Sequence, residues 1–505
     1  YIHRELGLQF NHQKERAIQP NTYPAKLDSA LIAWEIISKQ YLQWDGSSIG
    51  RFTPAAYDRL LHMNLNEQQR RALLSQLQRP DHPKMVDLVL ADLAAKYSGG
   101  FGSLPIHHQL LLSQLDQLLA RQPSLRTSSA FVNAYITKLR PSSDSDWRND
   151  PKLSADYLDR LWAFASTLDP VFNSLKLHIL HHRLLLDQSQ GIADKARFMT
   201  YIQLPRHRDY MRPEYLVASD SRHRADLQYN VSLITGLPAV GDDEPLLRDL
   251  LFQIFEQEES IEPYAKYLRD TFLNECLAEA KILRGVGDPQ RWFALLSPAQ
   301  AKALKERIDI RWSPTNKRRF GPADPVVLDV DVKNVDKLII RHYVLNTENY
   351  YRQTQQELDL GVNLEGLVAN GQKVVPCDEN PFLRARRRFE FPELAGRGAF
   401  VIELIGNGVR SRALVLKGDI RFLEKPTAAG HLFTLLDEAG KVIKEGAIWM
   451  AGHEYKTDAD GRIMIPYSTN PAQQQIILRV GNFCSIGNFQ HLAESYQLTA
   501  GIHVD

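Results

Sequence analysis

The chain has 505 residues, of which 44% are hydrophobic and 24% are charged. This length suffices for about two to four domains, and the composition excludes a largely disordered, collagen-like or coiled-coil chain. The 61 basic and 60 acidic residues leave a formal net charge of +1, which argues against a dedicated nucleic-acid binder.

The first three-fifths of the chain show the spacing of apolar residues that is typical of helices. The clearest stripe, at intervals of three and four, consists of Leu246, Leu250, Leu251, Ile254 and Phe255. Helix starts are predicted at Thr53-Pro54, Asp150-Pro151 and Ser297-Pro298, because capping side chains and early prolines favour the first turn. No repeat of fixed period is visible. The sequence therefore predicts an irregular all-α array over residues 1–310, with a possible internal boundary near 141–150 or 236–245.

The pattern changes between Ile308 and Pro325, where helical spacing gives way to alternation. Leu328, Val330 and Val332 alternate with polar residues, which predicts a half-buried strand. The turn Gly406-Asn407-Gly408 between two apolar runs predicts a β-hairpin. Short strands separated by turns continue toward the end of the chain, the last of them at Ser495 to Thr499, and are typical of antiparallel sandwiches.

The predicted fold class is therefore α+β multidomain. An N-terminal irregular all-α helical array is followed by two antiparallel, immunoglobulin-like β-sandwich modules. The sequence places the two modules at residues 320–417 and 418–505, with the division near Lys417-Gly418-Asp419.

Two histidines are the strongest candidates for metal ligands. His178 and His182 are four residues apart in a predicted helix, so they share one face and could hold a metal ion. A third ligand could come from Asp187 or His207. The helix is apolar nearly all round, which favours the alternative that it is buried and that its histidines bond to neighbouring groups.

Two basic clusters are the strongest candidates for a binding surface. They consist of Arg384, Arg386, Arg387 and Arg388, and of Lys317, Arg318 and Arg319. If the two clusters converge, they form a cationic patch that could hold an acidic partner or a polysaccharide. The first cluster also fits a solvated edge strand whose charges prevent aggregation, and this second interpretation is favoured.

The three cysteines, Cys276, Cys377 and Cys484, are widely separated and suggest neither a disulfide framework nor a zinc-binding pair. One bridge between Cys377 and Cys484 stays open. No Walker-type, dinucleotide-binding or Gly-x-Ser-x-Gly pattern is visible. We therefore expect no cofactor, and the sequence leans away from an enzyme.

Both ends of the chain suggest a piece of a longer protein. The chain begins at Tyr1 without a methionine or a signal-peptide core, and it ends at Asp505 directly after a strand-like stretch. No apolar run approaches the roughly 20 residues of a membrane-spanning helix, so we expect no transmembrane segment in this piece.

The β portion resembles a known family. The strands Asp324 to Val335 and Ile340 to Tyr343 resemble the opening of macroglobulin-type domains. The hairpin around Asp437 to Val442 and the turn Thr457 to Arg462 look like a following module of that type. Residues 320–505 are thus similar to the modules of large bacterial macroglobulin-like proteins. The resemblance implies an exported, periplasmic or cell-surface protein and protease trapping by a longer parent, although the Cys-Gly-Glu-Gln thioester motif is not in this sequence.

The leading hypothesis is a non-enzymatic binding or structural segment of a larger, bacterial macroglobulin-like protein, serving protein–protein interaction or as a protease-trap scaffold. Its expected partner is another protein or other domains of the same parent chain. No binding to nucleic acid is expected. In the alternative hypothesis, the helical part is a metal-dependent hydrolase centred on His178 and His182, with the sandwiches as accessory modules.

Overall fold

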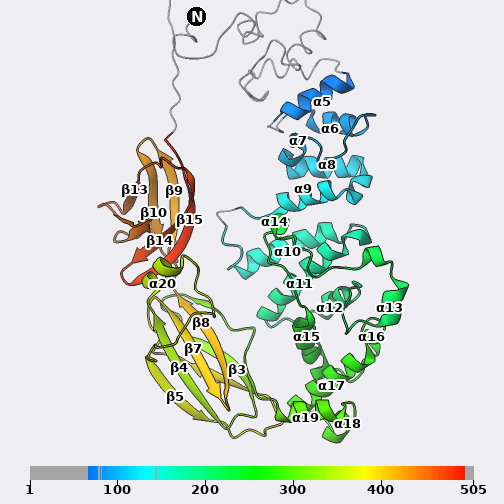
Figure 1. Ribbon diagram of the computed structural model, residues 1–505, viewed down its shortest axis with the longest axis vertical. Coiled ribbons are helices and arrows are strands. Elements are labelled where there is room, and N and C mark those ends of the chain that lie inside the picture. Colours follow the sequence, from blue (N-terminus) through cyan, green and yellow to red (C-terminus); the bar gives the residue numbers. More distant parts are fainter. Residues whose placement is uncertain (1–65, 78–79, 81, 143–144, 495–505) are drawn as a thin grey trace, which may run out of the picture. The chain divides into compact units, whose positions relative to one another are not determined.

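The computed structural model describes residues 66–77, 80, 82–142 and 145–494, and the chain divides into two compact units. In the described part, the first unit runs to Leu186 and also includes Asp194–Leu247 and Glu262–Arg269. The second unit contains Asp187–Ala193, Arg248–Ile261 and the residues from Asp270 onward. Along the chain, helices come first and strands follow (Figure 1), which confirms the predicted fold class.

The first unit is built from helices around an apolar core. Its helices are α5 (Glu67–Gln76), α6 (Met85–Leu93), α7 (Pro105–Gln109), α8 (Leu112–Arg121), α9 (Ser129–Leu139), α10 (Pro151–Ala165), α11 (Asn173–Ser189), α12 (Lys195–Ile202), α13 (Pro213–Ala218), α14 (Ser232–Thr235) and α16 (Glu262–Ala265). The last residues of α11 belong to the second unit, and α15 (Glu244–Gln257) likewise passes from the first unit into the second. Phe131, Tyr157 and Leu161 are fully buried in the core of this unit.

Local sequence signals explain where several helices begin. The carboxylate of Asp150 accepts hydrogen bonds from the backbone N–H groups of Lys152 and Leu153, so it caps α10 as predicted. Ser297 caps α19 (Pro298–Glu306), and Gln300 completes the capping box. The apolar stripe of α15 is buried, as its spacing predicted. The predicted start at Thr53-Pro54 lies outside the described residues.

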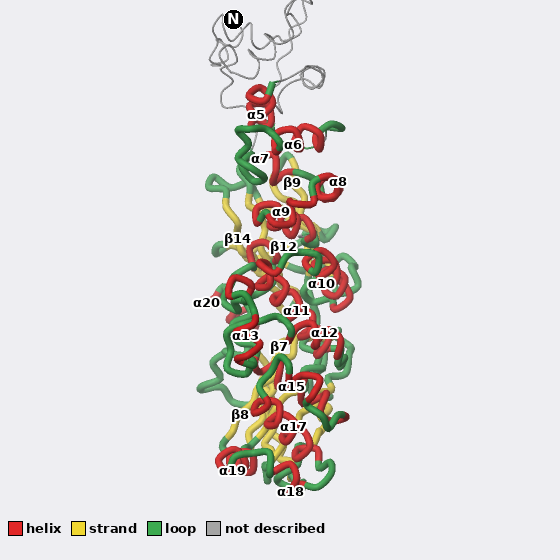
Figure 2. Tube along the Cα trace, turned by 90° about the vertical axis from the view of Figure 1, so that its right-hand side faces the viewer, coloured by secondary structure: helices red, strands yellow, loops and turns green. Residues whose placement is uncertain are grey.

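The second unit joins helices to two sandwiches. The helices α17 (Asp270–Arg284), α18 (Pro289–Phe293) and α19 come first, and both views show them close together (Figures 1 and 2). The first sandwich has a three-stranded sheet in the order β1-β3-β6 and a five-stranded sheet in the order β2-β8-β7-β4-β5. Its strands are β1 (Asp309–Trp312), β2 (Arg319–Phe320), β3 (Val327–Lys333), β4 (Lys337–Leu345), β5 (Gly371–Pro376), β6 (Ala385–Glu390), β7 (Gly398–Gly406) and β8 (Val409–Lys417). Leu328, Ile340 and Val415 from the two sheets meet in one core.

The second sandwich follows directly. Its sheets have the orders β13-β10-β9 and β12-β11-β14-β15. Its strands are β9 (Arg421–Thr427), β10 (Gly430–Leu436), β11 (Ala447–Met450), β12 (His453–Lys456), β13 (Arg462–Ile465), β14 (Ala472–Val480) and β15 (Phe483–His491). Phe433, Ile448 and Ile476 fill the core between the sheets. The strand predicted at Ser495 to Thr499 lies outside the described residues.

The helix α20 (Thr347–Thr354) and the segment after it link the two sandwiches within the second unit. Tyr351 and Leu358 pack into one apolar cluster with Val401 of the first sandwich and Ile477 of the second. The hydroxyl of Thr347 accepts a hydrogen bond of 3.1 Å from the backbone N–H of Cys484. This shared cluster holds the two sandwiches together.

The hairpin predicted around Gly406-Asn407-Gly408 is present as β7 and β8. Asn407 and Gly408 have φ angles of 45° and 83°, as a two-residue turn of type I′ requires. Cys377 and Cys484 lie in different apolar clusters as free thiols, so the bridge that the sequence left open does not form. None of the helices in the described part of the chain is long and apolar enough to cross a bilayer.

Candidate functional site

One face of the three-stranded sheet carries charged side chains. Successive side chains of a strand point to opposite faces, and Leu328, Val330 and Val332 of β3 face the core. We call the opposite side of the sheet the charged face, and its members are Asp309 and Arg311 from β1, Asp329, Asp331 and Lys333 from β3, and Arg384, Arg386 and Arg388 from β6 and the residue before it. The strand register sets opposite charges across from each other, which favours pairing of the strands.

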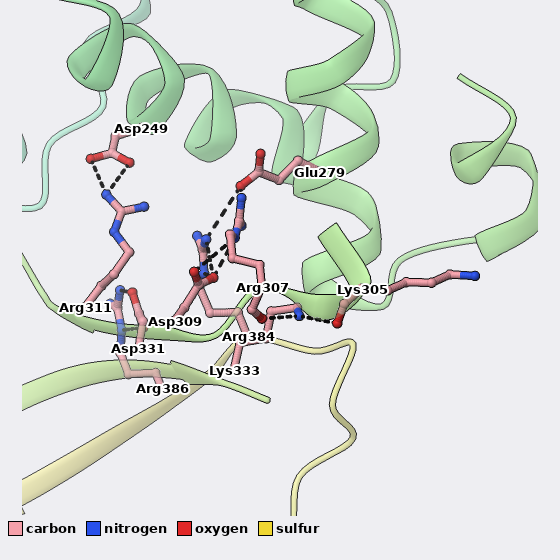
Figure 3. Close-up of polar contacts among 10 residues, drawn as sticks. All are labelled: Asp249, Glu279, Lys305, Arg307, Asp309, Arg311, Asp331, Lys333, Arg384 and Arg386. Atoms are coloured by element: carbon pink, nitrogen blue, oxygen red, sulfur yellow. Dashed lines mark hydrogen bonds and ion pairs between the residues drawn. The ribbon is translucent and has the colours of Figure 1, made fainter. Parts of the chain in front are cut away.

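At one end of this face, a buried joint connects the sandwich to helix α17. We define it by Glu279, Arg307, Asp309, Lys333 and Arg384 (Figure 3). The Arg384 guanidinium donates to Asp309 Oδ2 through Nε at 3.2 Å and Nη2 at 2.9 Å. Arg307 donates from Nη2 to Glu279 Oε1 at 2.6 Å, and its Nε lies 3.0 Å from Asp309 Oδ1. Asp309 is 6% exposed and Arg384 7% exposed, so these charges have lost most of their contact with water.

Lys333 anchors the same joint to the end of helix α19. Its ammonium group donates to the backbone carbonyls of Lys305 at 3.3 Å and Arg307 at 2.8 Å (Figure 3). The last carbonyls of a helix have no partner within the helix and attract positive charge, so Lys333 stabilises this terminus. Burial lowers the pKa of Lys333, and the neighbouring Asp309 opposes that shift.

At the other end, the charged face is open to solvent. Arg388 donates to both carboxylate oxygens of Asp329 at 2.8 and 3.0 Å, and Arg386 donates to those of Asp331 at 2.9 and 3.0 Å. The Arg388 side chain is 68% exposed. The hydrogen bond from Arg388 lowers the pKa of Asp329. These exposed forks are accessible to another molecule, whereas Asp309 and Arg384 of the buried joint are not.

The basic residues singled out from sequence have different surroundings. Arg384 is buried, which contradicts the expectation that it lies on an exposed strand; helix α17 covers it, and the Leu283 carbonyl accepts its backbone N–H. Arg386 and Arg388 share the charged face, while Arg387 points to the other side of β6 and pairs with Glu379. Strand β6 lies at the edge of its sheet, as the favoured interpretation had it.

The second basic cluster belongs to the other sheet of the sandwich. Arg319 lies in β2, which pairs with β8, and Lys317 and Arg318 precede it. All three side chains are exposed. Strand pairing therefore does not join this cluster to the arginines of β6, and a role of either cluster in binding stays a prediction.

The histidines of α11 lie inside the first unit. His178 is 1% exposed, and the Nε2 atom of His182 lies 2.8 Å from the Pro238 carbonyl oxygen. Burial lowers the pKa of His178 to about 3 and that of His181 to about 4, so both rings are neutral at pH 7. Within the described ranges, no three His, Cys, Asp or Glu residues are grouped to hold a metal ion. Metal binding by His178 and His182 stays a prediction.

The contribution of β3 to the charged face was not identified from the sequence. Asp329, Asp331 and Lys333 stand at every second position, and so do Arg384, Arg386 and Arg388. Two segments with this matching alternation are candidates for neighbouring strands. Glu279 carries no comparable signal, because its role depends on where α17 packs.

Family comparisons account for most of the chain. The family described as actin-binding protein F N-terminal domain matches residues 31–308, which is more than half of the chain. The chain belongs to this family. A second family, described as AbpF first immunoglobulin-like domain, matches residues 338–418. The first sandwich is therefore immunoglobulin-like.

One curated relative, actin-binding protein F from Dictyostelium discoideum, is 31% identical over 492 residues, which are 95% of this chain and 20% of the relative. The chain thus spans about one fifth of that relative's length. A native α2-macroglobulin structure from Escherichia coli, spanning domains MG0-NIE-MG1, has a TM-score of 0.26 at 12% identity, covering 36% of this chain and 64% of that one. A chimeric titin Z1Z2 tandem has a TM-score of 0.20 at 13% identity, covering 37% of this chain and 100% of that one. At such scores neither structure carries an argument.

The family comparison corrects the expected membership of a bacterial macroglobulin-like family. The family shown is that of actin-binding protein F, and macroglobulin modules are only weak structural neighbours. Hairpins and Asp-Gly turns recur in many immunoglobulin-like sandwiches, so the motifs between Asp324 and Arg462 could not separate these families. The expected export rested on that resemblance and stays a prediction.

Proposed function

We propose that this chain is a non-enzymatic, actin-binding segment of a longer protein. The observation that carries the proposal is the 31% identity over 492 residues to a protein named for actin binding. The similarity includes the helical part and both sandwiches, since it covers 95% of the chain. The partner is thus a protein, in agreement with the leading hypothesis from the sequence.

The geometry of the second unit supports a scaffold that presents a surface at a fixed orientation. The buried joint fixes the first sandwich to α17 and α19 through the buried pair of Asp309 with Arg384 and the partly exposed pair of Arg307 with Glu279. The cluster around α20 fixes the second sandwich to the first. A segment built in this way holds its binding surface rigidly, which suits a structural binding protein.

The solvent-exposed end of the charged face is the surface that we assign to actin contact. An exposed ion pair contributes only about 0–1 kcal/mol, so Arg386 and Arg388 can exchange their carboxylate partners at small cost. Arginine presents several donors in a rigid fork and is favoured at protein interfaces. Lys317, Arg318 and Arg319, exposed on the same sandwich, are the second candidate contact.

Co-sedimentation of the 505-residue protein with filamentous actin tests both parts of the proposal. A double variant, Arg386→Gln with Arg388→Gln, should bind roughly five- to thirtyfold more weakly, because each of the two lost contacts costs about 0.5–1 kcal/mol. The matched control is Arg462→Gln, which removes an arginine that is 56% exposed and paired with Asp460 in the second sandwich. The control should bind as the wild type does.

The possible results separate the partner from the surface. If the wild type fails to pellet with actin, the proposal that actin is the partner is wrong. If the double variant and the Arg462→Gln control bind equally well, actin contacts another surface.

A further inference from the structure

The first unit contains a pocket lined by residues from two Arg-His-Arg runs and from the segment that follows the second run. The runs are Arg206-His207-Arg208, after α12, and Arg222-His223-Arg224, after α13 (Figure 1). A parallel bridge joins Arg206 to Ala225, and the Ala225 N–H donates to the Pro205 carbonyl at 2.7 Å. The pocket has a volume of about 330 Å³, and the polar side chains that line it are Arg206, His207, Arg208, Arg224, Asp226 and Gln228.

Arg206 is held rigidly in the wall of this pocket although it is fully buried. Its Nε donates to the Tyr210 hydroxyl at 2.8 Å and lies 2.9 Å from Asp243 Oδ2, and its Nη1 donates to the Leu204 carbonyl at 2.8 Å. The hydroxyls of Tyr201 and Tyr210 in turn donate to Asp243. The Nη2 atom has no partner in the described part of the chain. A buried donor without a partner is unfavourable, so a ligand that accepts a hydrogen bond from it would be stabilised.

The other two arginines retain positive charge in the pocket. Arg208 donates from Nη2 to the Gly241 carbonyl at 2.8 Å, and Arg224 from Nη2 to the Leu216 carbonyl at 2.7 Å. Carbonyl groups hold the guanidinium groups in place without neutralising them. The Nε atoms of Arg208 and Arg224 are buried and have no partner among the described residues. These two cations outweigh the one carboxylate that lines the pocket, that of Asp226.

We propose that this pocket binds the phosphate group of a small phosphate monoester. Three arginines line the pocket, and arginine forks match the spacing of the oxygens of a tetrahedral dianion. The volume is at the lower end of the range for small-molecule sites and exceeds what a bare anion fills, so it leaves room for a small organic group. The site lies in the first unit, so a failure to bind phosphate there would leave the proposal of actin binding through the second unit unaffected.

Calorimetric titration of the 505-residue protein with inorganic phosphate and with O-phosphoserine tests this site. We expect saturable binding of both, with the ester at least threefold tighter. Arg208→Gln and Arg224→Gln should each weaken binding of both probes at least tenfold. Arg222→Gln is the matched control, because it removes the same charge from the same run, but its side chain is 82% exposed, pairs with Asp220 and does not line the pocket. The control should bind within twofold of the wild type.

Each outcome decides for or against the pocket. If the wild type binds neither probe at 10 mM, the proposal is wrong. If all three substitutions weaken binding equally, the proposal is also wrong, because the protein then attracts anions only through its overall charge. Tighter binding of inorganic phosphate than of O-phosphoserine would contradict the proposal of a phosphate monoester and would indicate a site for small inorganic anions. If one of the two pocket variants fails to fold, the wild-type titration and the other variant still decide.

Discussion

At the scale of single residues, Asp309 is the carboxylate on which the buried joint depends. It faces both Arg307 and Arg384, and its removal would leave these two guanidinium groups with Glu279 as their shared carboxylate partner. Asp309→Asn should therefore destabilise the second unit by about 3 kcal/mol. Asp329→Asn in the same sheet is the control, because it removes an exposed pair that contributes at most about 1 kcal/mol. Urea unfolding followed by tryptophan fluorescence measures both, and equal losses would contradict the distinction between the two ends of the charged face.

His178 gives a second prediction at this scale, through its dependence on pH. Burial holds its folded-state pKa at about 3, below the ordinary value of 6.5, so the unfolded chain takes up a proton that the folded chain does not. The first unit should thus be most stable above pH 6.5 and lose stability as the pH falls toward 3. His178→Leu removes this contribution, and its melting temperature should fall less than that of the wild type between pH 7 and pH 5.

The same variant also addresses the predicted metal site. Both ring nitrogens of His178 lack a partner in the described part of the chain, so leucine should match or raise the melting temperature at pH 7. A large loss at pH 7, together with loss of bound zinc, would instead support metal binding by His178 and His182.

At the scale of elements, α20 is predicted to couple the sandwiches. Tyr351 is 6% exposed in the shared cluster, and Tyr351→Ala should cost about 3 kcal/mol through lost burial and the cavity left behind. The distance between spin labels at Lys373 and Lys456, one on each sandwich, should become more broadly distributed. Gln353→Ala on the exposed side of the same helix is the control. An unchanged distance distribution in Tyr351→Ala would show that other contacts hold the sandwiches together.

Elements that depend on neighbouring residues could be predicted from the sequence, and those that depend on long-range packing could not. The hairpin of β7 and β8 is encoded locally by Asn407 and Gly408. The ion pairs of the charged face join residues 55 and 59 positions apart, and alternation alone does not fix which strands become neighbours. The burial of Arg384 depends on the docking of α17, so its run of arginines resembled a continuous exposed surface.

At the scale of the whole molecule, the division into helices and sandwiches was correctly predicted, whereas the family was not. Fold class follows from periodicity, which composition and spacing reveal directly. Family membership depends on specific residues, and many sandwiches share the turns on which the macroglobulin resemblance rested. The helical part, which carried no recognisable motif, is the part that the matching N-terminal family covers.

The most direct test of the central claim is the fraction of the 505-residue protein that pellets with filamentous actin as the actin concentration rises. The proposed function predicts a fraction that saturates, at a fixed molar ratio, under physiological salt. A fraction that never exceeds the amount pelleted without actin would contradict it.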